Sequence, residues 1–473
     1  MLARQLPLAD LRRRLAFAPG LLRLALPISL QVLMTTALNL ADTFMVGQLG
    51  ATQIGAIALG NQIFFLLLLF QLGVGSGGAM FASQYWGAGD IAGVQRSLGL
   101  SLLLGTAGAA VFSAAAIAVP GMLLSVFTTD AAVIAEGSSY LRIVGASYVV
   151  TAISLGYTQA LRSVGKPQLP MIASALSITL NIAGNYLLIF GKLGLPALGV
   201  AGAALSTAIA RVIELAIILR GVYRRPGPIA ASLRQLTDWS ARFVRKFLLR
   251  TAPVVANELL WSTGFTMYTV VFGRMGTEYL AAYNISDTVG RLLLVIFIST
   301  AHASAVTIGN TIGAARVREA AEIGRTLLYL VPIAAALVGI LGFFVIAPTV
   351  PALFEVSTAV RVLVRRFLQL FAILMLAKTI NMHVIVGILR SGGDTRYSLL
   401  IDVLPLWLIG VPLAMVSGLV LGLPAPIVYI ALGIEESVRL VLGWRRVRSG
   451  RWIHDLTDRE PAEARVQESL AER

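Results

Sequence analysis

The sequence predicts an all-α polytopic membrane protein with twelve transmembrane helices in two pseudo-symmetric six-helix lobes. Only 13% of its 473 residues are charged and 57% are hydrophobic, whereas ordinary globular chains carry about 25% charged residues. The apolar residues form runs long enough to cross a bilayer, which takes about 20 residues per helix. Such runs must be helical, because lipid offers no hydrogen-bond partners to the backbone. The third observation is an internal duplication.

The duplication is visible as residues that recur at a fixed distance. Four pairs are 226 positions apart, and one Leu-Arg-Ser-x-Gly motif recurs after 228. The pairs are Pro27 and Pro253, Gly47 and Gly273, Gly50 and Gly276, and Gly87 and Gly313, and the motif is Leu161–Gly165 and Leu389–Gly393. Because each half has an even number of spans, the repeats are parallel and related by an axis along the membrane normal. Duplicated apolar halves of this kind are typical of secondary transporters.

The predicted spans follow the apolar runs in order. They cover residues 21–46, 54–82, 94–119, 131–156, 168–190, 197–221, 247–272, 282–308, 320–346, 357–386, 397–420 and 424–447. The chain therefore divides into an N-terminal arm (1–20), an N-lobe (21–221), a linker (222–246), a C-lobe (247–447) and a tail (448–473). Within the linker, an amphipathic stretch around Trp239 predicts a short helix on the inner membrane surface.

Basic residues indicate the orientation of the spans. The net charge is +15, and Lys and Arg gather in the arm, the linker, the tail and the loops after even-numbered spans. By the positive-inside rule, both termini are cytoplasmic. We expect a multi-pass protein of the bacterial inner membrane whose charge meets anionic lipid headgroups and does not bind nucleic acid.

The first half carries the clearest functional candidate. An ionisable residue within a span is costly and defaults to a functional hypothesis. Asp42 lies three residues after Asn39, so both share one face of the first span, which Pro27 can bend. Further candidates are Asn181 and Asn185 on one face of span five, and Thr207 in span six. Such a set can hold Na⁺ at Asp42, Asn181 and Asn185, or can titrate with H⁺, and either event changes a buried charge.

The second half carries a different set of polar residues. Glu258 follows Asn257 in span seven, five residues after Pro253. The other C-lobe candidates for substrate contact are Asp287, Asn381 and Asp402, although Asp287 and Asp402 equally suit structural pairing, for example with Lys378 or Arg291. Ion pairing along one helix face is the expected role of Glu435 and Glu436, which precede Arg439. A soft cavity lining for amphipathic cations is expected from Met34, Trp261 and Tyr268, with lipid-facing or packed positions as the alternative.

Several functional classes are disfavoured by the composition. The absence of cysteine excludes disulfides and thiolate metal sites. The three histidines stand far apart in sequence, so we expect no catalytic metal. No Gly-x-Ser-x-Gly elbow accompanies a candidate base, and we expect no catalytic residues and no enzyme.

A set of segments resembles the multidrug and toxic compound extrusion (MATE) family over residues 20–447. These segments are Asn39–Thr43, Gly47–Gly50, Ala160–Gly165, Asn181–Tyr186, Phe272–Gly276 and Leu389–Thr395. The resemblance implies two six-helix lobes around a central cleft, and export of organic cations or drugs coupled to inward H⁺ or Na⁺. It implies that Asp42 is the coupling acid, surrounded by Asn181 and Asn185. Asn185 departs from relatives that have Asp there. Glu258, Asn257 and Trp261 look like a bacterial branch near the NorM group.

The resulting hypothesis is a monomeric antiporter that works by alternating access, with no cofactor besides the coupling ion. The alternatives are a lipid-linked oligosaccharide flippase of the same superfamily, a membrane-embedded enzyme and a channel. A flippase would need a strongly cationic central cavity for pyrophosphate, whereas the charges within the spans lean acidic. The acids themselves do not repeat, because Tyr268 stands 226 residues after Asp42 and Val32 stands 226 before Glu258.

Overall fold

The computed structural model describes residues 16–457, and the predicted arm and tail lie partly outside this range. The first half is formed by α2 (Ala18–Gly47), α3 (Ala51–Gly87), α4 (Ile91–Ala118), the short α5 (Pro120–Ser125), α6 (Ala131–Gly145), α7 (Tyr148–Ser163), α8 (Gln168–Phe190) and α9 (Gly199–Arg224). The linker contains the four-residue α10 (Leu233–Leu236), which ends before Trp239, the residue around which a short helix was predicted.

The second half begins with α11 (Ala241–Met275), α12 (Thr277–Gly313) and α13 (Val317–Leu341), which continues through η1 (Gly342–Ile346), α14 (Ala347–Thr349) and η2 (Val350–Leu353). It ends with α15 (Thr358–Met382) and η3 (His383–Arg390), then α16 (Thr395–Pro405), η4 (Leu406–Gly410), α17 (Val411–Met415) and η5 (Val416–Val420), and finally α18 (Ala425–Ser449). The segments η1, η3, η4 and η5 are π-helical.

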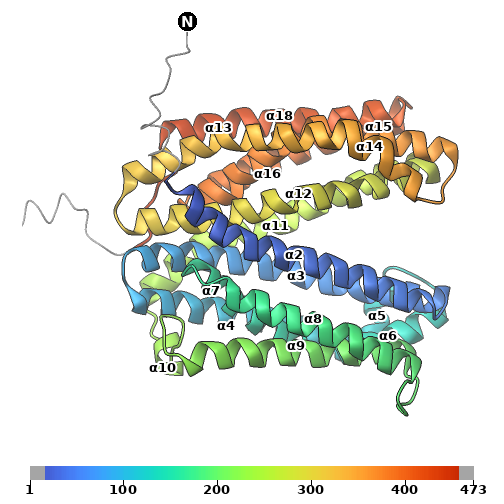
Figure 1. The fold of residues 1–473 in the computed structure, drawn as a ribbon, viewed down its shortest axis with the longest axis horizontal. Helices are drawn as coiled ribbons and strands as arrows, with labels where there is room; N and C mark the ends of the chain where they lie inside the picture. The colour runs from blue at the N-terminus through green and yellow to red at the C-terminus, as the bar shows by residue number, and fades with distance from the viewer. Residues whose placement is uncertain (1–15, 458–473) are drawn as a thin grey trace, which may run out of the picture.

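Figure 1 shows the two halves as two groups of helices, with α2–α9 below and α11–α18 above. Within residues 16–457, nine helices are long and apolar enough to cross a membrane, or ten if the bent pair α6–α7 is one span. The remaining two predicted spans correspond to α11 and α18, which carry Asn257 and Glu258, and Glu435, Glu436 and Arg439, respectively. The predicted all-helical fold of twelve spans in two lobes is thereby confirmed.

The fourth predicted span is not one straight helix. The structure breaks residues 131–156 into α6 and α7, which meet at 48°. The break falls at Gly145 and Ser147, a pair typical of helix kinks, and the Ser147 hydroxyl donates to the carbonyl of Val144 at 2.6 Å. That side-chain bond offers the backbone an alternative to a continuous helix, which apolar patterning does not reveal.

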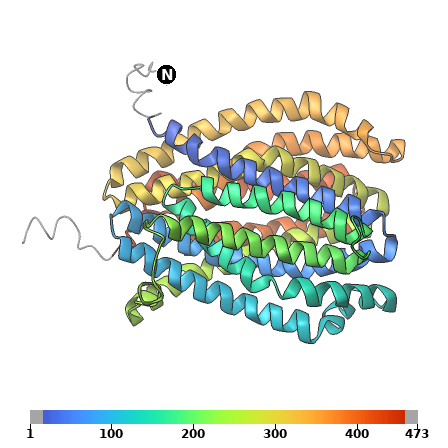
Figure 2. The same ribbon diagram turned by 60° about the horizontal axis from the view of Figure 1, so that its bottom comes forward.

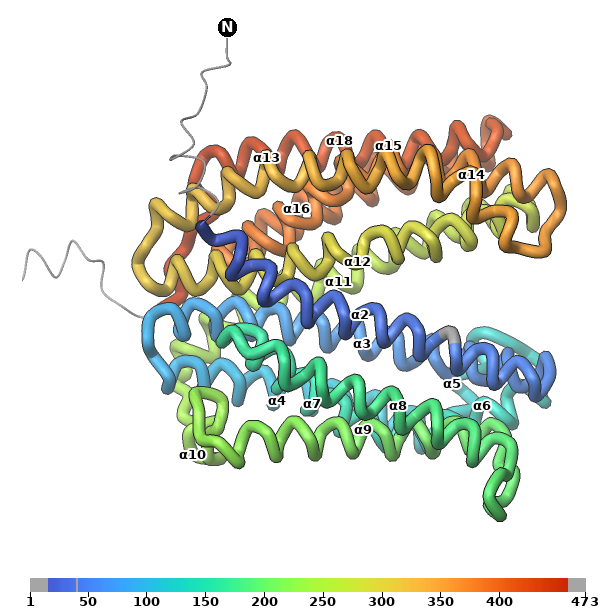
Figure 3. The backbone as a smooth tube through the Cα atoms, in the orientation of Figure 1, coloured from blue at the N-terminus to red at the C-terminus, as the bar shows by residue number. Residues whose placement is uncertain are grey.

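The two lobes meet closely at one end of the molecule, where the described chain begins; we call it the terminal end (left in Figure 3). There α3 and α12 are packed backbone to backbone. A Cβ atom on Gly87 would lie 2.0 Å from the carbonyl oxygen of Asn310, and one on Gly313 would lie 1.8 Å from that of Gln84. These two contacts are related by the 226-residue offset, so the pseudo-two-fold axis passes between them. Figure 2 shows α10 at the same end, beside the start of α4.

A segment after α18, residues 451–457, closes the terminal end across both lobes, and we call it the C-terminal strap. Trp452 is fully buried in the C-lobe cluster around Ile388, and Leu456 is 1% exposed in a cluster with Phe81 of the N-lobe. Gln84 of α3 donates to the carbonyls of Ser391 and His454, and it accepts from the Leu456 N–H at 2.7 Å. The strap therefore holds the two lobes together at this end.

Candidate functional site

Three of the predicted N-lobe residues meet Asp42 in space. Asn185 donates to Asp42 Oδ1 at 2.6 Å. Asn181 accepts from Asn185 at 3.2 Å and donates to the Thr207 hydroxyl at 3.2 Å, and the opposite amide orientation would direct its nitrogen to Asp42 Oδ1 at 3.3 Å. Asn181 and Asn185 are buried, and Asn185 Oδ1 has no hydrogen-bond partner in the protein. The site thus joins one carboxylate to neutral amides and a hydroxyl, and its oxygens suit Na⁺ or H⁺.

Asn39 does not belong to this group. It lies one turn before Asp42, but it is exposed, and only its backbone carbonyl is engaged, by the Thr43 hydroxyl at 2.8 Å. Met34, two turns before Asp42 on the same helix, is half-buried. The two residues follow the face that sequence spacing predicts, but they do not contact the carboxylate.

A second polar chain in the N-lobe was missed by the sequence analysis. Gln31 donates to Ser174 at 2.7 Å, and Ser174 donates to Glu214 at 2.6 Å. Arg211 completes the chain by pairing with Glu214 at 3.0 Å. Both Arg211 and Glu214 lie within the predicted sixth span, so the rule that flagged Asp42 also applies to them.

The C-lobe candidates form an ion-pair network. Arg439 contacts Asp402 at 3.1 Å, Glu435 at 3.4 Å and Glu436 at 3.9 Å. Asn257 donates to Asp402 at 2.7 Å, and Asn381 donates to Glu436 at 2.7 Å. The predicted pairing of Glu435 and Glu436 with Arg439 is confirmed. Lys378 pairs with Glu436 at 2.9 Å and not with Asp402 as the sequence suggested.

Glu258 and Asp287 lie outside this network. Glu258 pairs with Arg390 at 2.6 Å, and Asp287 pairs with Arg291 at 2.7 Å, as one of the two sequence interpretations expected. The Arg291 side chain is 66% exposed. Asp287 therefore forms a surface pair along one helix, while Glu258 compensates a buried guanidinium.

The two predicted aromatic cavity residues of α11 differ in their surroundings. Trp261 is 36% exposed and stacks on Phe265, with the ring centroids 5.4 Å apart. Tyr268 is 2% exposed and lies in the C-lobe core. A Cβ on Gly410 would meet both the Tyr268 hydroxyl and Glu435 Oε2, so these two oxygens approach the same point. Both oxygens are buried and face each other.

The duplication relates the two polar clusters residue by residue. Asn257, Asp402 and Arg439 are the equivalents of Gln31, Ser174 and Arg211, at offsets of 226, 228 and 228. Two further equivalent pairs are Asp42 with Tyr268, and Thr207 with Glu435. The hydrogen bond from Gln31 to Ser174 is repeated by that from Asn257 to Asp402. The offset is therefore the sequence signal that could have found the missed N-lobe chain.

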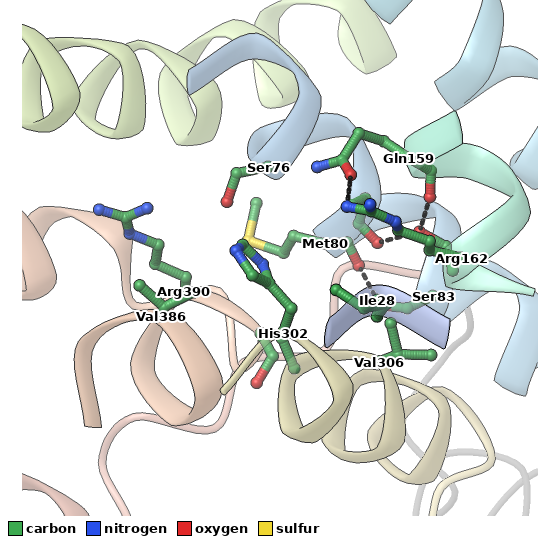
Figure 4. A pocket seen from close by; sticks show the side chains of 14 residues that line it. Ile28, Ser76, Met80, Ser83, Gln159, Arg162, His302, Val306, Val386 and Arg390 are labelled. Atoms are coloured by element: carbon green, nitrogen blue, oxygen red, sulfur yellow. Dashed lines mark hydrogen bonds between the residues drawn. The ribbon is translucent and has the colours of Figure 1, made fainter. Parts of the chain in front are cut away.

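A cavity of about 40 Å³ lies between the lobes, near the terminal end (Figure 4). Its fourteen lining residues come from α2, α3, α7, α12 and η3, and from Ser391, which follows η3. They include five pairs of residues that the duplication relates. The pairs are Ser76 and His302, Ala79 and Ala305, Met80 and Val306, Arg162 and Arg390, and Ser163 and Ser391. The cavity thus sits on the pseudo-two-fold axis. None of the lining residues is acidic, so the lining of this cavity is basic.

The chain is similar to known membrane transporters. The MatE family model matches residues 27–187 and 253–416, one match in each lobe. The uncharacterized transporter YisQ of Bacillus subtilis is 28% identical over 441 residues, covering 92% of this chain and 95% of YisQ. A probable multidrug resistance protein NorM of Bradyrhizobium diazoefficiens is 28% identical over 432 residues, covering 88% and 90%. A solved structure of the Vibrio cholerae MATE transporter VcmN matches with a TM-score of 0.83 and 21% identity, covering 92% and 98%.

Proposed function

This chain belongs to the MatE family of multi-pass membrane transporters, and we propose that it exports organic cations and drugs in exchange for H⁺ or Na⁺. The observation that carries the proposal is the contact of 2.6 Å between Asp42 and Asn185, because it surrounds one carboxylate with neutral partners. Members of the family are transporters, which excludes the membrane-embedded enzyme that the sequence left open. The relatives named NorM and MdtK support drugs as the substrate class.

Coupling in this proposal begins with a change of charge at Asp42. A proton or Na⁺ that binds there neutralises the carboxylate, and the unpartnered Asn185 Oδ1 is positioned to accept the new O–H or to coordinate the ion. Arg211, paired with Glu214, contributes positive potential nearby without contacting the carboxylate. Loss of the negative charge removes the ionic character of the bond from Asn185, which is about twice as strong as a neutral bond.

Helix α2 can transmit this change because it contacts both lobes. Its first turns place Leu21 and Ala25 in a C-lobe cluster, whereas Val46 near its end lies in an N-lobe cluster. Pro27 lies between these contacts and removes a backbone hydrogen bond. A shift of α2 around Pro27 therefore changes how the lobes pack, which is the step that opens one side and closes the other.

The ion gradient suffices for concentrative export. One charge crossing the membrane is worth about 2.3 kcal/mol per 100 mV, and one pH unit adds about 1.4 kcal/mol. Because each 1.4 kcal/mol is tenfold, together they sustain a gradient of about 10²–10³-fold for a neutral substrate. In the proposed orientation both termini are cytoplasmic, so the packed terminal end faces the cytoplasm.

A lipid-linked oligosaccharide flippase is the second candidate, because the inter-lobe cavity carries Arg162 and Arg390. Its volume of about 40 Å³ holds two or three water-sized groups, which is less than a pyrophosphate requires. A drug does not fit this volume either, so the cavity does not separate the two candidates, and drug export is preferred because of the relatives named NorM and MdtK.

Transport by Asp42→Asn in proteoliposomes tests the proposal. Under an imposed pH or Na⁺ gradient, we expect wild-type protein to move a fluorescent organic cation and Asp42→Asn to lose all gradient-driven transport while remaining folded. Asp238→Asn, at an exposed linker position, is the matched control and should transport normally. Normal coupled transport by Asp42→Asn would overturn the coupling role. Transport of a lipid-linked sugar by the wild type, without any drug transport, would favour the flippase instead.

A further inference from the structure

The cavity on the pseudo-two-fold axis presents hydrogen-bond donors from both lobes. Arg162 and Arg390 lie on opposite sides of it, with His302 between them (Figure 4). Ser76 and Gln159 also contribute to the polar lining, whereas the hydroxyls of Ser83, Ser163 and Ser391 already donate to backbone carbonyls. Guanidinium groups only donate hydrogen bonds, so this lining suits a ligand that accepts them.

The existing hydrogen bonds leave both arginines incompletely satisfied. Arg162 donates to Gln31 at 2.6 Å and to Gln159 at 3.0 Å, and Arg390 donates to Glu258 at 2.6 Å. The Nε atoms of both arginines are buried and have no hydrogen-bond partner in the protein. Arg390 is only 6% exposed. An unpartnered buried donor costs more free energy when it belongs to a charged group than when it belongs to a neutral one. A hydrogen-bond acceptor beside these Nε atoms would therefore stabilise the protein.

The charge balance of the lining favours one negative charge. Glu258 neutralises Arg390. Among residues 16–457, the hydrogen-bond partners of Arg162 are two neutral amides, so its positive charge has no carboxylate in contact. An unpaired charge in a protein interior is costly. A single anion beside Arg162 would offset that cost.

The size of the cavity limits what can bind. A volume of about 40 Å³ corresponds to two or three water-sized groups. This accommodates a halide or one carboxylate group, but neither a phosphodiester nor a whole drug. Asp42 is 14 residues further along α2 than the lining residue Ile28, or about 21 Å at the helical rise, so the two sites are separate.

We propose that the inter-lobe cavity binds one small monovalent anion between Arg162 and Arg390, either a free halide-sized ion or the carboxylate of a zwitterionic solute. Because the arginines belong to different lobes, a bound anion links the lobes at the terminal end. The site is therefore occupied when the lobes are packed as described and is dismantled when they separate there. This inference does not depend on which cation Asp42 binds.

Anion titration of the purified transporter tests the proposal. The protein in detergent is transferred to a gluconate buffer, and chloride or formate is added at constant ionic strength while the thermal unfolding midpoint is recorded. We expect saturable stabilisation of the wild type and at least about tenfold weaker apparent affinity in Arg162→Gln, since one lost charged contact of about 1.4 kcal/mol is tenfold. Arg396→Gln, which removes an exposed positive charge at the same end, is the control and should bind as the wild type does.

The double variant Glu258→Gln/Arg390→Gln removes the second arginine without stranding Glu258, and it should weaken binding similarly. If only a zwitterionic drug stabilises the protein, and its methyl ester does not, the carboxylate of the solute is the occupant. If neither the free anions nor the zwitterionic drug stabilises the protein, or if Arg162→Gln responds as the wild type does, water alone satisfies the arginines and the proposal is overturned.

Discussion

In the N-lobe, Gln31 donates to Ser174 beside Arg211, and at the equivalent place in the C-lobe Asn257 donates to Asp402 beside Arg439. The geometry is shared, but the charges are not. Ser174 is neutral where Asp402 is ionisable, and Arg439 contacts three carboxylates while Arg211 pairs with Glu214. The duplication therefore preserved the frame of each lobe, and later substitutions decided how much charge it holds.

The position of the isolated acid differs as well. In the N-lobe it is Asp42, on the first helix of the lobe. The equivalent residue in the C-lobe is Tyr268, and the acid near it is Glu435, which lies on the last helix at the equivalent of Thr207. A change of charge in the N-lobe thus acts on α2, which contacts both lobes. In the C-lobe it acts on α18, whose acids are held by Arg439. The N-lobe acid is therefore suited to motion and the C-lobe acids to rigidity.

The largest predicted loss of stability distinguishes the C-lobe network around Arg439 from the N-lobe pair of Arg211 and Glu214. Arg439→Met leaves Asp402 and Glu435 without a cationic partner, whereas Glu436 keeps Lys378, and we expect it to lower the free energy of unfolding by about 3–5 kcal/mol. Arg211→Met strands only Glu214, and the Arg211 side chain is 30% exposed, so about 1.5–3 kcal/mol is expected. Denaturant unfolding of both variants in the same detergent measures the difference. Equal losses would contradict the distinction between a rigid C-lobe network and a looser N-lobe pair.

An intermediate loss of stability is expected from a change in one of two equivalent loops. Asp394 in the C-lobe loop is the equivalent of Lys166 in the N-lobe loop, so the two loops carry opposite charges at this position. Burial raises the pKa of Asp394, but hydrogen bonds and positive charge from His454 and Arg446 lower it more, so its pKa is below the usual value of 3.8. A lowered pKa in the folded state stabilises the protein above about pH 4, and this contribution is lost as the pH falls further.

We therefore expect Asp394→Asn to cost about 1.5–3 kcal/mol near pH 7, and this cost to shrink below pH 4. Unfolding of wild type and variant from pH 7 to pH 3 measures both. Asp455→Asn, an exposed strap position that bonds only to Thr457, is the control. A cost that is constant down to pH 3 would show that the carboxylate charge is not what stabilises this loop.

The smallest effect is expected on the surface of α12. Arg291→Gln removes the pair with Asp287, and because the Arg291 side chain is 66% exposed, we expect a loss of about 0.5 kcal/mol or less. Thermal unfolding in low and high salt measures it. A loss comparable to that of Arg439→Met would mean that Asp287 belongs to the C-lobe network after all.

Composition and periodicity predicted the helices well because the requirement for apolar length comes from the bilayer itself. The contact of Asp42 with Asn185 was implied by the resemblance to the MATE family. Spacing within one helix says nothing about which neighbouring helix supplies that partner, and Asn39, which shares the helix face of Asp42, does not contact its carboxylate. The pairing of Lys378 with Glu436 depends on the register between α15 and α18, which no local pattern encodes. Equally, the π-helical η3 that leads to Arg390 has the same apolar composition as an α-helix.

The C-terminal strap has a consequence for how the protein is made. Trp452 and Leu456, which join the lobes at the terminal end, follow every membrane-spanning helix in the chain. At roughly 5–20 residues per second, Trp452 is synthesised about 10–50 s after residue 221, the predicted end of the N-lobe. The N-lobe is therefore inserted before the segment that fastens it to the C-lobe exists, and it must be stable in the bilayer without the strap.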